Sequence, residues 1–294
     1  MRVRTDGGAW QSHGIVHWLL EAPGELAGGA PPDGVDPRDE WSSDWVAACK
    51  TTVPMRRPLL LLVLLSACAT DVAVDGPADH DEPADFEPAP ADGKADGVPA
   101  TFNPNDVIGD DVFIAATAMD VADVQAFFEH TPYGTRSWLA SAQIDGVSAA
   151  QAVVDAARGE GIHPLMLVAR MQVESSLVSK TVAPSQYRQD KALGCGCPDG
   201  GGCSVSYRGL DKQLVCGARV LRTWYDASID GSGEWRKDHA KRTLDPKTVT
   251  PATHATASLY AYTPWVLQGS GGTWLVWNVT KKYLRHAEDS GLIH

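Results

Sequence analysis

The sequence predicts a mainly α-helical protein, in which a single globular helical domain (residues 101–294) follows a signal peptide and a disordered tether. Apolar residues recur at spacings of three and four in several segments after residue 120, which is the helical period. Strand signals are sparse, and no repeat of about twenty to fifty residues divides the chain. About 190 residues are left for the domain, a length that suits one core.

An apolar run near residue 60 has the form of a secretion signal. Basic residues after Met55 precede a leucine-rich run from Leu59 to Leu65, and small residues lead to Cys68. The run is much shorter than the roughly 18–20 apolar residues that cross a bilayer, so we interpret residues 55–68 as a signal peptide. Leu65-Ser-Ala-Cys68 resembles a bacterial lipobox, which implies that Cys68 is acylated and becomes the mature N-terminus.

Residues 1–54 stand before this signal, although signal peptides act at the start of a chain. They hold four tryptophans among Gly, Pro and acidic residues, without sustained periodicity. We therefore expect translation to begin at Met55, so that residues 1–54 are either not part of the native protein or disordered.

Residues 69–100 are rich in Asp, Pro, Ala and Gly, and we interpret them as a tether. Nine acidic residues and one lysine lie between Asp71 and Gly97, so eight of the chain's twelve net negative charges belong to this segment. Such a composition buries too little apolar surface to fold. A flexible coil of this length spans about 30 Å, which lets an anchored domain reach nearby material.

The first two helices of the domain are predicted from apolar stripes and capping residues. An apolar stripe from Val121 to Phe128 marks the first helix. Ser148 is expected to cap the second helix, which runs to Arg158 and is ended by Gly159 and Gly161.

The third helical segment carries the most informative residue. From Gly161 to Val173 nearly every residue is apolar, and the pattern ends on Glu174. A carboxyl group that leaves a buried helix toward a cleft is partly desolvated, which disfavours its ionised form and suits a general acid. The alternative is a structural ion pair on the helix surface with Arg170, four residues earlier.

Three more helices are expected toward the C-terminus. One runs from about Gly209 to Tyr225 with leucines along one stripe, and the last spans Trp274 to His286. Between them, Thr250-Pro251 predicts the cap and first turn of a further helix.

Four cysteines belong to the exported domain: Cys195, Cys197, Cys203 and Cys216. They allow three pairings, among which the sequence does not choose. A structural zinc site is an alternative, because four thiolates suit tetrahedral coordination. An exported protein meets an oxidising compartment, so we favour two disulfides that staple the Gly-rich loop 194–202.

Several other functions lack the residues that they need. The Gly-rich loop is not followed by Gly-Lys-Ser/Thr, so phosphate binding is not predicted, and thinly spread basic residues argue against a nucleic-acid partner. His163, His239, His254 and His286 lack metal-ligand spacing and are expected at helix starts, on the surface or in the core. No metal or cofactor is predicted.

An ordered set of motifs runs through the domain. Gly161-Ile-His-Pro opens the helix that ends in Glu174-Ser175, and three segments follow: Ala192-Leu-Gly-Cys-Gly-Cys-Pro-Asp, Tyr207-Arg-Gly-Leu-Asp-Lys-Gln and Ala255-Thr-Ala-Ser-Leu-Tyr-Ala-Tyr-Thr-Pro. In this order they resemble the lysozyme-like superfamily, particularly goose-type lysozymes and lytic transglycosylases. The resemblance covers about residues 121–283 and implies an α+β lysozyme-like fold.

The resemblance also implies site residues. Glu174 matches the catalytic acid of the family. The candidates for substrate binding are Ser175, Gln213, Tyr260 and Tyr262. Two motifs depart from the family pattern: Gly209-Leu-Asp-Lys-Gln213 stands where lytic transglycosylases usually have Gly-Leu-Met-Gln, and Thr263 stands where the Ala-Tyr-Asn element has Asn.

Glycosidases commonly use two carboxylates, yet the sequence shows one obvious acid. Asp199 and Asp211 follow Glu174 in sequence, but turn formation and charge at a helix start explain them. A single acid agrees with the resemblance, because lytic transglycosylases use one Glu as acid and then base, and the N-acetyl and 6-hydroxyl groups of the sugar complete the reaction.

We therefore predict an exported, lipid-anchored enzyme that cleaves the glycan strand of peptidoglycan, with Glu174 as general acid/base. A hydrolytic muramidase of the same fold and a non-catalytic peptidoglycan-binding lipoprotein are the alternatives, and a zinc enzyme ranks last. Ala69 follows the lipidated Cys68, which by resemblance to known sorting rules implies the outer membrane, facing the periplasm or cell surface. The sequence leaves the oligomeric state open.

Overall fold

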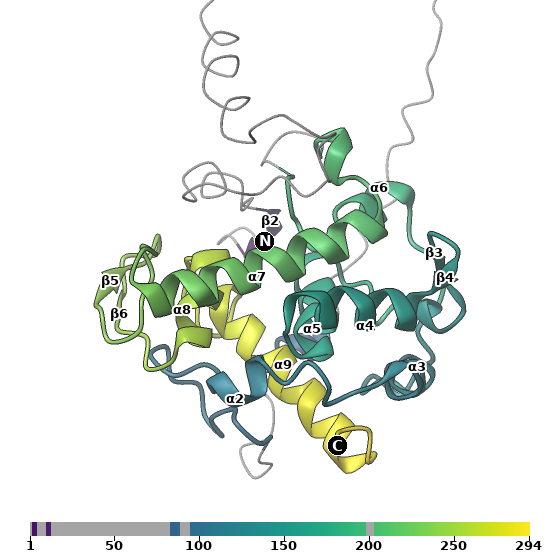
Figure 1. Cartoon of the computed structure of the whole chain (residues 1–294), viewed down its shortest axis with the longest axis horizontal. Coiled ribbons are helices and arrows are strands. Elements are labelled where there is room, and N and C mark those ends of the chain that lie inside the picture. Colours follow the sequence, from purple (N-terminus) through teal and green to yellow (C-terminus); the bar gives the residue numbers. More distant parts are fainter. Residues whose placement is uncertain (1, 5–9, 13–82, 89–94, 198–202) are drawn as a thin grey trace, which may run out of the picture. The chain divides into compact units, whose positions relative to one another are not determined.

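A computed structural model describes residues 2–4, 10–12, 83–88, 95–197 and 203–294 of the chain (Figure 1). Residues 55–68, for which a signal peptide with Cys68 at its end is predicted, lie outside these ranges, as do residues 69–82 and 89–94 of the predicted tether. In the upstream segment, β1 (Arg2–Arg4) pairs antiparallel with β2 (Trp10–Ser12).

The described part of the chain is mainly α-helical, which confirms the prediction of a mainly helical protein. Its α-helices are α2 (Asp110–Phe113), α3 (Val121–Glu129), α4 (Ala149–Glu160), α5 (Pro164–Ser175), α6 (Gln186–Asp190), α7 (Leu210–Asp230), α8 (His254–Tyr262) and α9 (Gly272–Asp289). Single 3-10 turns are η1 (Pro83–Asp85), η2 (Trp138–Ser141) and η3 (Val205–Tyr207). Two small antiparallel pairs complete the domain: β3 (Gln143–Ile144) with β4 (Val147–Ser148), and β5 (Lys241–Arg242) with β6 (Thr248–Val249).

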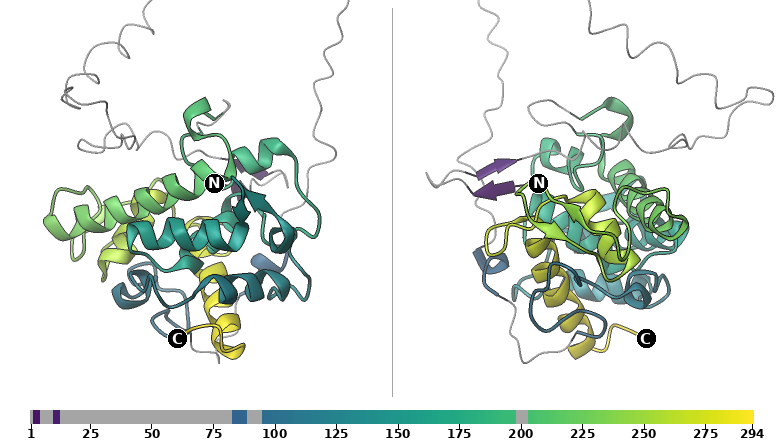
Figure 2. Two further views of the ribbon diagram at one scale, coloured as in Figure 1. Left: turned by 45° about the vertical axis from the view of Figure 1, so that its right-hand side comes forward. Right: turned by 90° about the vertical axis from the view of Figure 1, so that its left-hand side faces the viewer.

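Helix α5 forms the centre of the core, since all of its residues from Pro164 to Ser175 are buried. It packs against α4, α7 and α9, while the long helix α7 also packs against α8 (Figure 2). A helix that is apolar nearly all round is stable only when it is covered on every side, as it is here.

The capping residues explain where the early helices begin and end. Ser148 caps α4 as predicted, because its side chain accepts a hydrogen bond from Gln151 N. Gly161 ends α4 in the left-handed conformation, with φ of 66°. His163 caps α5 through Nδ1, which accepts from Leu165 N at 3.0 Å.

Two of the later helix boundaries differ from the predictions. Helix α8 begins at His254 and not at Pro251, because the capping side chain is that of Thr253. Thr250 and Pro251 instead bond to other loops: Thr250 N donates to Asn105 Oδ1, and Pro251 O accepts from Asp238 N. Helix α7 runs on to Asp230, one turn beyond the prediction.

The later part of the predicted tether packs on the domain. Asp85 is buried, and its carboxylate accepts hydrogen bonds from Gln172 of α5 and Lys282 of α9. A β-bridge joins Ala95 to Val98, and both are buried. The structure therefore differs from the expectation of a disordered segment at residues 83–88 and 95–100, because polar side chains of the domain supply partners that composition alone does not reveal.

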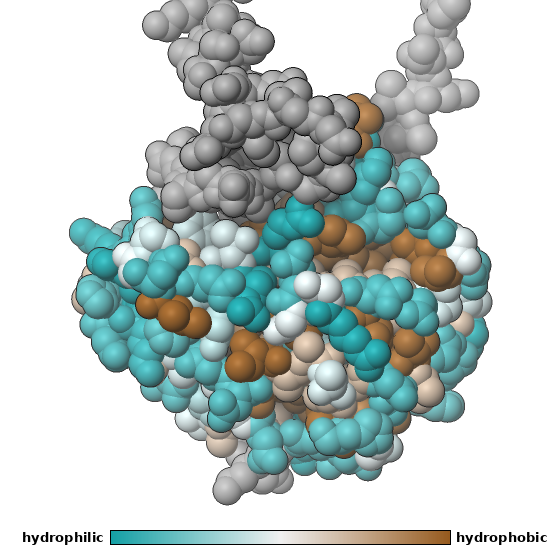
Figure 3. Space-filling view, viewed as in Figure 1, coloured by the Kyte–Doolittle hydropathy of each residue, from teal (hydrophilic) through white to brown (hydrophobic). Residues whose placement is uncertain are grey.

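Among the residues that the structure describes, large apolar side chains on the surface are few and scattered in sequence. On the face drawn in Figure 3 they form separate patches within a polar surface. Within the residues that the structure describes, no helix is long and apolar enough to cross a membrane.

Candidate active site

The carboxylate of Glu174 lies in a buried ion pair at the end of α5. Arg170 Nη2 donates to Glu174 Oε1 at 2.5 Å, and the two side chains are only 1% and 2% exposed. The i,i+4 pair that the sequence suggested is therefore formed, but inside the protein and not on the helix surface. Two opposite charges attract each other more strongly at this depth than on a surface, because water screens them less, although both also lose their hydration.

Arg170 is fixed by two residues from the end of α8. Its Nη1 donates to Thr263 Oγ1 at 3.0 Å, and its guanidinium lies 4.0 Å from the centre of the Tyr262 ring. Its Nε is buried and has no hydrogen-bond partner among the described residues. These contacts join two elements that are far apart in sequence around one carboxylate.

Tyr262 is fully buried behind this pair. Its hydroxyl donates to Leu193 O at 2.9 Å, and burial raises the pKa of the phenol well above its usual value. Tyr262 is therefore neutral. Its ring contacts the guanidinium of Arg170, which in turn pairs with the Glu174 carboxylate.

Tyr260, another candidate, lies elsewhere in the core. Its ring stacks on Trp235, with 5.0 Å between centres. Its hydroxyl is buried without a hydrogen-bond partner in the described ranges. Burial raises the pKa of this phenol as well. Tyr260 is thus not brought into contact with Glu174 by any described interaction.

Ser175 ties the end of α5 to the segment that follows α6. Its Oγ lies 2.9 Å from Met171 O and 2.8 Å from Ala192 O, within hydrogen-bond distance of both. Arg188 Nη1 donates to Ser175 O at 3.2 Å. Ser176 then ends the helix in the left-handed conformation, with φ of 53°. Ser175, the residue after Glu174, is therefore held by hydrogen bonds both within α5 and to the segment around α6.

Gln213 organises the loop that crosses the end of α5. Its Oε1 accepts from the N–H groups of Leu193 and Cys195, both at 3.1 Å. Its Nε2 donates to Cys195 O at 2.6 Å and Tyr207 O at 2.7 Å. These four bonds use the whole hydrogen-bonding capacity of the amide, so in this arrangement Gln213 holds the loop and has none left for a ligand.

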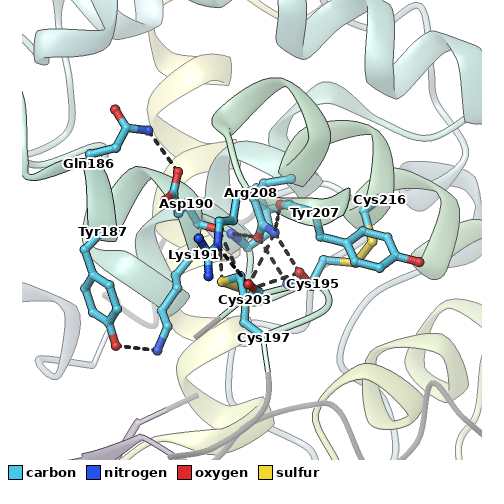
Figure 4. Close-up of a disulfide and its surroundings, with 12 residues drawn as sticks. Gln186, Tyr187, Asp190, Lys191, Cys195, Cys197, Cys203, Tyr207, Arg208 and Cys216 are labelled. Atoms are coloured by element: carbon cyan, nitrogen blue, oxygen red, sulfur yellow. Dashed lines mark hydrogen bonds between the residues drawn. A yellow bond between two sulfur atoms is a disulfide. The ribbon is translucent and has the colours of Figure 1, made fainter. Parts of the chain in front are cut away.

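Two disulfides staple the same loop, as we predicted, and the structure gives their pairing. Cys195 is joined to Cys216 of α7, and Cys197 to Cys203. Figure 4 shows both bridges, with Tyr207 and Arg208 beside them. Disulfide-bonded cysteines offer no thiolates, so the zinc alternative fails. No group of three or more His, Cys, Asp or Glu in the described ranges could hold a metal ion.

Asp211 and Asp199 are the remaining acidic candidates. Asp211 lies in the first turn of α7, where negative charge is favourable. Asp199 lies outside the described residues.

Of the predicted site residues, the structure brings Glu174, Ser175 and Tyr262 to the end of α5. The sequence indicated Arg170 only as an ion-pair partner on the helix surface and gave little importance to Thr263. The helical spacing of Arg170 and Glu174 was visible, but the contact with Thr263 depends on the packing of α8 on α5.

Comparison of the chain with known proteins gives no relative. No family model matches it, and neither the curated proteins nor the solved structures with which it was compared include a match.

Proposed function

We propose that this protein is an exported, lipid-anchored enzyme of lysozyme-like fold that cleaves the glycan strand of peptidoglycan between N-acetylmuramic acid and N-acetylglucosamine. Glu174 acts as general acid and then as general base. The observation that carries the proposal is a single carboxylate placed at the end of a buried helix and oriented by residues from two elements.

The reaction needs one carboxyl group and no water. Glu174 gives its proton to the glycosidic oxygen as the bond from that oxygen to C1 of the muramic sugar breaks, and the sugar's N-acetyl oxygen bonds to C1 in its place. The carboxylate then takes the proton of the 6-hydroxyl group, whose oxygen bonds to C1 and displaces the N-acetyl oxygen. The products are an N-acetylglucosamine end and a 1,6-anhydro muramic end.

This proposal requires that the glycan can reach the Glu174 carboxyl group. With 2% exposure, the Glu174 side chain cannot touch a glycan in the conformation described here. Access to Glu174 therefore requires movement of the chain that surrounds it. Loops that close over catalytic groups commonly open on the microsecond to millisecond timescale.

The test is replacement of Glu174 by glutamine in the full-length protein purified in detergent. Glu174→Gln keeps the shape of the side chain but removes its proton chemistry, so we expect release of soluble fragments from purified peptidoglycan to fall by about 100-fold or more. Glu160→Gln is the matched control, because Glu160 pairs with Arg219 at 3.3 Å on the domain surface. Unchanged release by Glu174→Gln would remove Glu174 from the proposed role.

A non-catalytic peptidoglycan-binding lipoprotein is the second candidate, and the ion pair itself favours it. The Arg170–Glu174 contact forms without a ligand, as expected of a structural ion pair. Sedimentation with purified peptidoglycan, with no fragments released by wild type, would support this candidate over the enzyme. A hydrolytic muramidase would instead release fragments with reducing muramic ends.

A further inference from the structure

We infer that Arg170 is a positioning residue for the proposed reaction: it orients the Glu174 carboxylate and favours its ionised form, and so sets the alkaline limit of activity. This inference rests on the proposed role of Glu174. Arg170 is not expected to touch the glycan, since its side chain is 1% exposed and both of its terminal nitrogens donate to protein groups.

The packing around Arg170 shows that the pair is held in one geometry. Thr263 Oγ1 accepts from Nη1, the Tyr262 ring lies under the guanidinium, and Nη2 donates to Glu174. The Arg222–Asp226 pair of α7 has the same i,i+4 spacing and a distance of 2.9 Å, but its side chains are 36% and 49% exposed. The exposed pair is screened by water, whereas the buried pair is not.

Charge at this site has a direct effect on a general acid. Two titratable groups that face Glu174 are Arg170, from its own helix, and Tyr262, from α8. Because Tyr262 remains neutral, the nearby positive charge of Arg170 favours the carboxylate over the carboxylic acid. The same charge stabilises the carboxylate that forms when the proton is given to the leaving group, so Arg170 makes Glu174 a stronger acid but one that is protonated over a lower pH range.

The pH dependence of kcat/KM tests this inference. In the full-length protein, Arg170→Gln removes the charge, and we expect the alkaline limb of the profile to move up by about one pH unit or more. Arg170→Lys keeps the charge and should hold the limb near its wild-type position, and Arg222→Gln serves as the control for loss of an i,i+4 pair. A limb that does not move in Arg170→Gln would overturn the inference, because a purely structural role lowers stability without moving the limb.

A less disruptive substitution tests the positioning role if Arg170→Gln does not fold. Thr263→Val removes only the hydroxyl that orients Arg170 and leaves the charge in place. We expect a severalfold loss of kcat with little change in KM, and recovery in Thr263→Ser. Equal kcat in Thr263→Val and wild type would contradict the positioning role.

Direct titration separates this inference from the proposed function. The Glu174 carboxyl is followed by carbon-13 NMR, assigned by its absence in Glu174→Gln. A titration midpoint that rises in Arg170→Gln supports the effect of Arg170 even if no activity is found. An unchanged midpoint refutes the inference, while loss of activity in Glu174→Gln would still support the proposed function.

Discussion

Several buried polar side chains of this protein make hydrogen bonds with specific partners in the core. Arg170 joins α5 to Thr263 and Tyr262, Gln213 saturates its amide on one loop, and His163 caps the helix that carries Glu174. A buried polar group stabilises a fold only when its bonds are satisfied, so each of these residues also specifies a conformation.

His163 makes stability depend on pH. Its Nδ1 accepts from Leu165 N only while the ring is neutral, and burial lowers its pKa from 6.5 to about 4. Between these two values the unfolded chain binds more protons than the folded chain, so the free energy of unfolding falls as the pH drops from 6.5 to about 4. The loss approaches about 3 kcal/mol at the lower end.

Urea unfolding at pH 7 and pH 4.5 measures this loss in wild type and in His163→Asn. Asparagine can cap a helix but does not titrate in this range. We expect the variant to lose about 2–3 kcal/mol less than wild type between the two pH values. Equal losses would show that His163 is not the group responsible.

The helices were predictable from sequence where local signals decide them. Helix α4 begins after Ser148 and ends at Gly161, as expected, and the apolar run before Glu174 forms α5. The start of α8 was not predictable, because Thr250 and Thr253 are both suitable capping residues. The hydrogen bond from Thr250 N to Asn105 leaves Thr253 as the cap. Tertiary packing also decided the disulfide pairing, the contact of Thr263 with α5 and the burial of the ion pair.

The packing of the stapled loop on α7 leads to a prediction for Gly217. A Cβ atom there would lie 2.4 Å from Leu193 Cδ2, so Leu193 must shift in Gly217→Ala. We expect the free energy of unfolding to fall by about 1–3 kcal/mol. Gly159→Ala on α4 meets nothing within 4 Å and should stabilise by up to about 1 kcal/mol. A Gly217→Ala protein as stable as Gly159→Ala would contradict the tight contact.

The described part of the chain combines a helical domain with a preceding segment, residues 83–88, that packs on it. Because residues 83–88 contact α5 and α9, they do not act as part of the flexible tether that was predicted for residues 69–100. Under the proposed lipid anchor, this contact would hold the domain closer to the membrane than the composition of residues 69–100 suggests.

Asp85 supplies the side chain that bonds this segment to the domain, beside backbone carbonyls that accept from Asn278 and Lys282. Its carboxylate accepts from Tyr133, Gln172 and Lys282, so Asp85→Ala removes one acceptor from each of three donors. We expect hydrogen exchange of the peptide around residues 83–88 to speed up by about tenfold or more, since local opening then costs less. Glu87→Ala is the control, because Glu87 contacts Asn278 through its backbone carbonyl. Equal exchange in both variants would show that Asp85 does not hold the segment.

The mass of the fragments that the full-length protein releases from purified peptidoglycan tests the central claim most directly. We predict fragments that end in 1,6-anhydro muramic acid from wild type and from Glu160→Gln, and none from Glu174→Gln. The same fragments from Glu174→Gln, or no fragments from wild type at matched concentration, would contradict the assignment of Glu174 as the acid that cleaves the glycan strand.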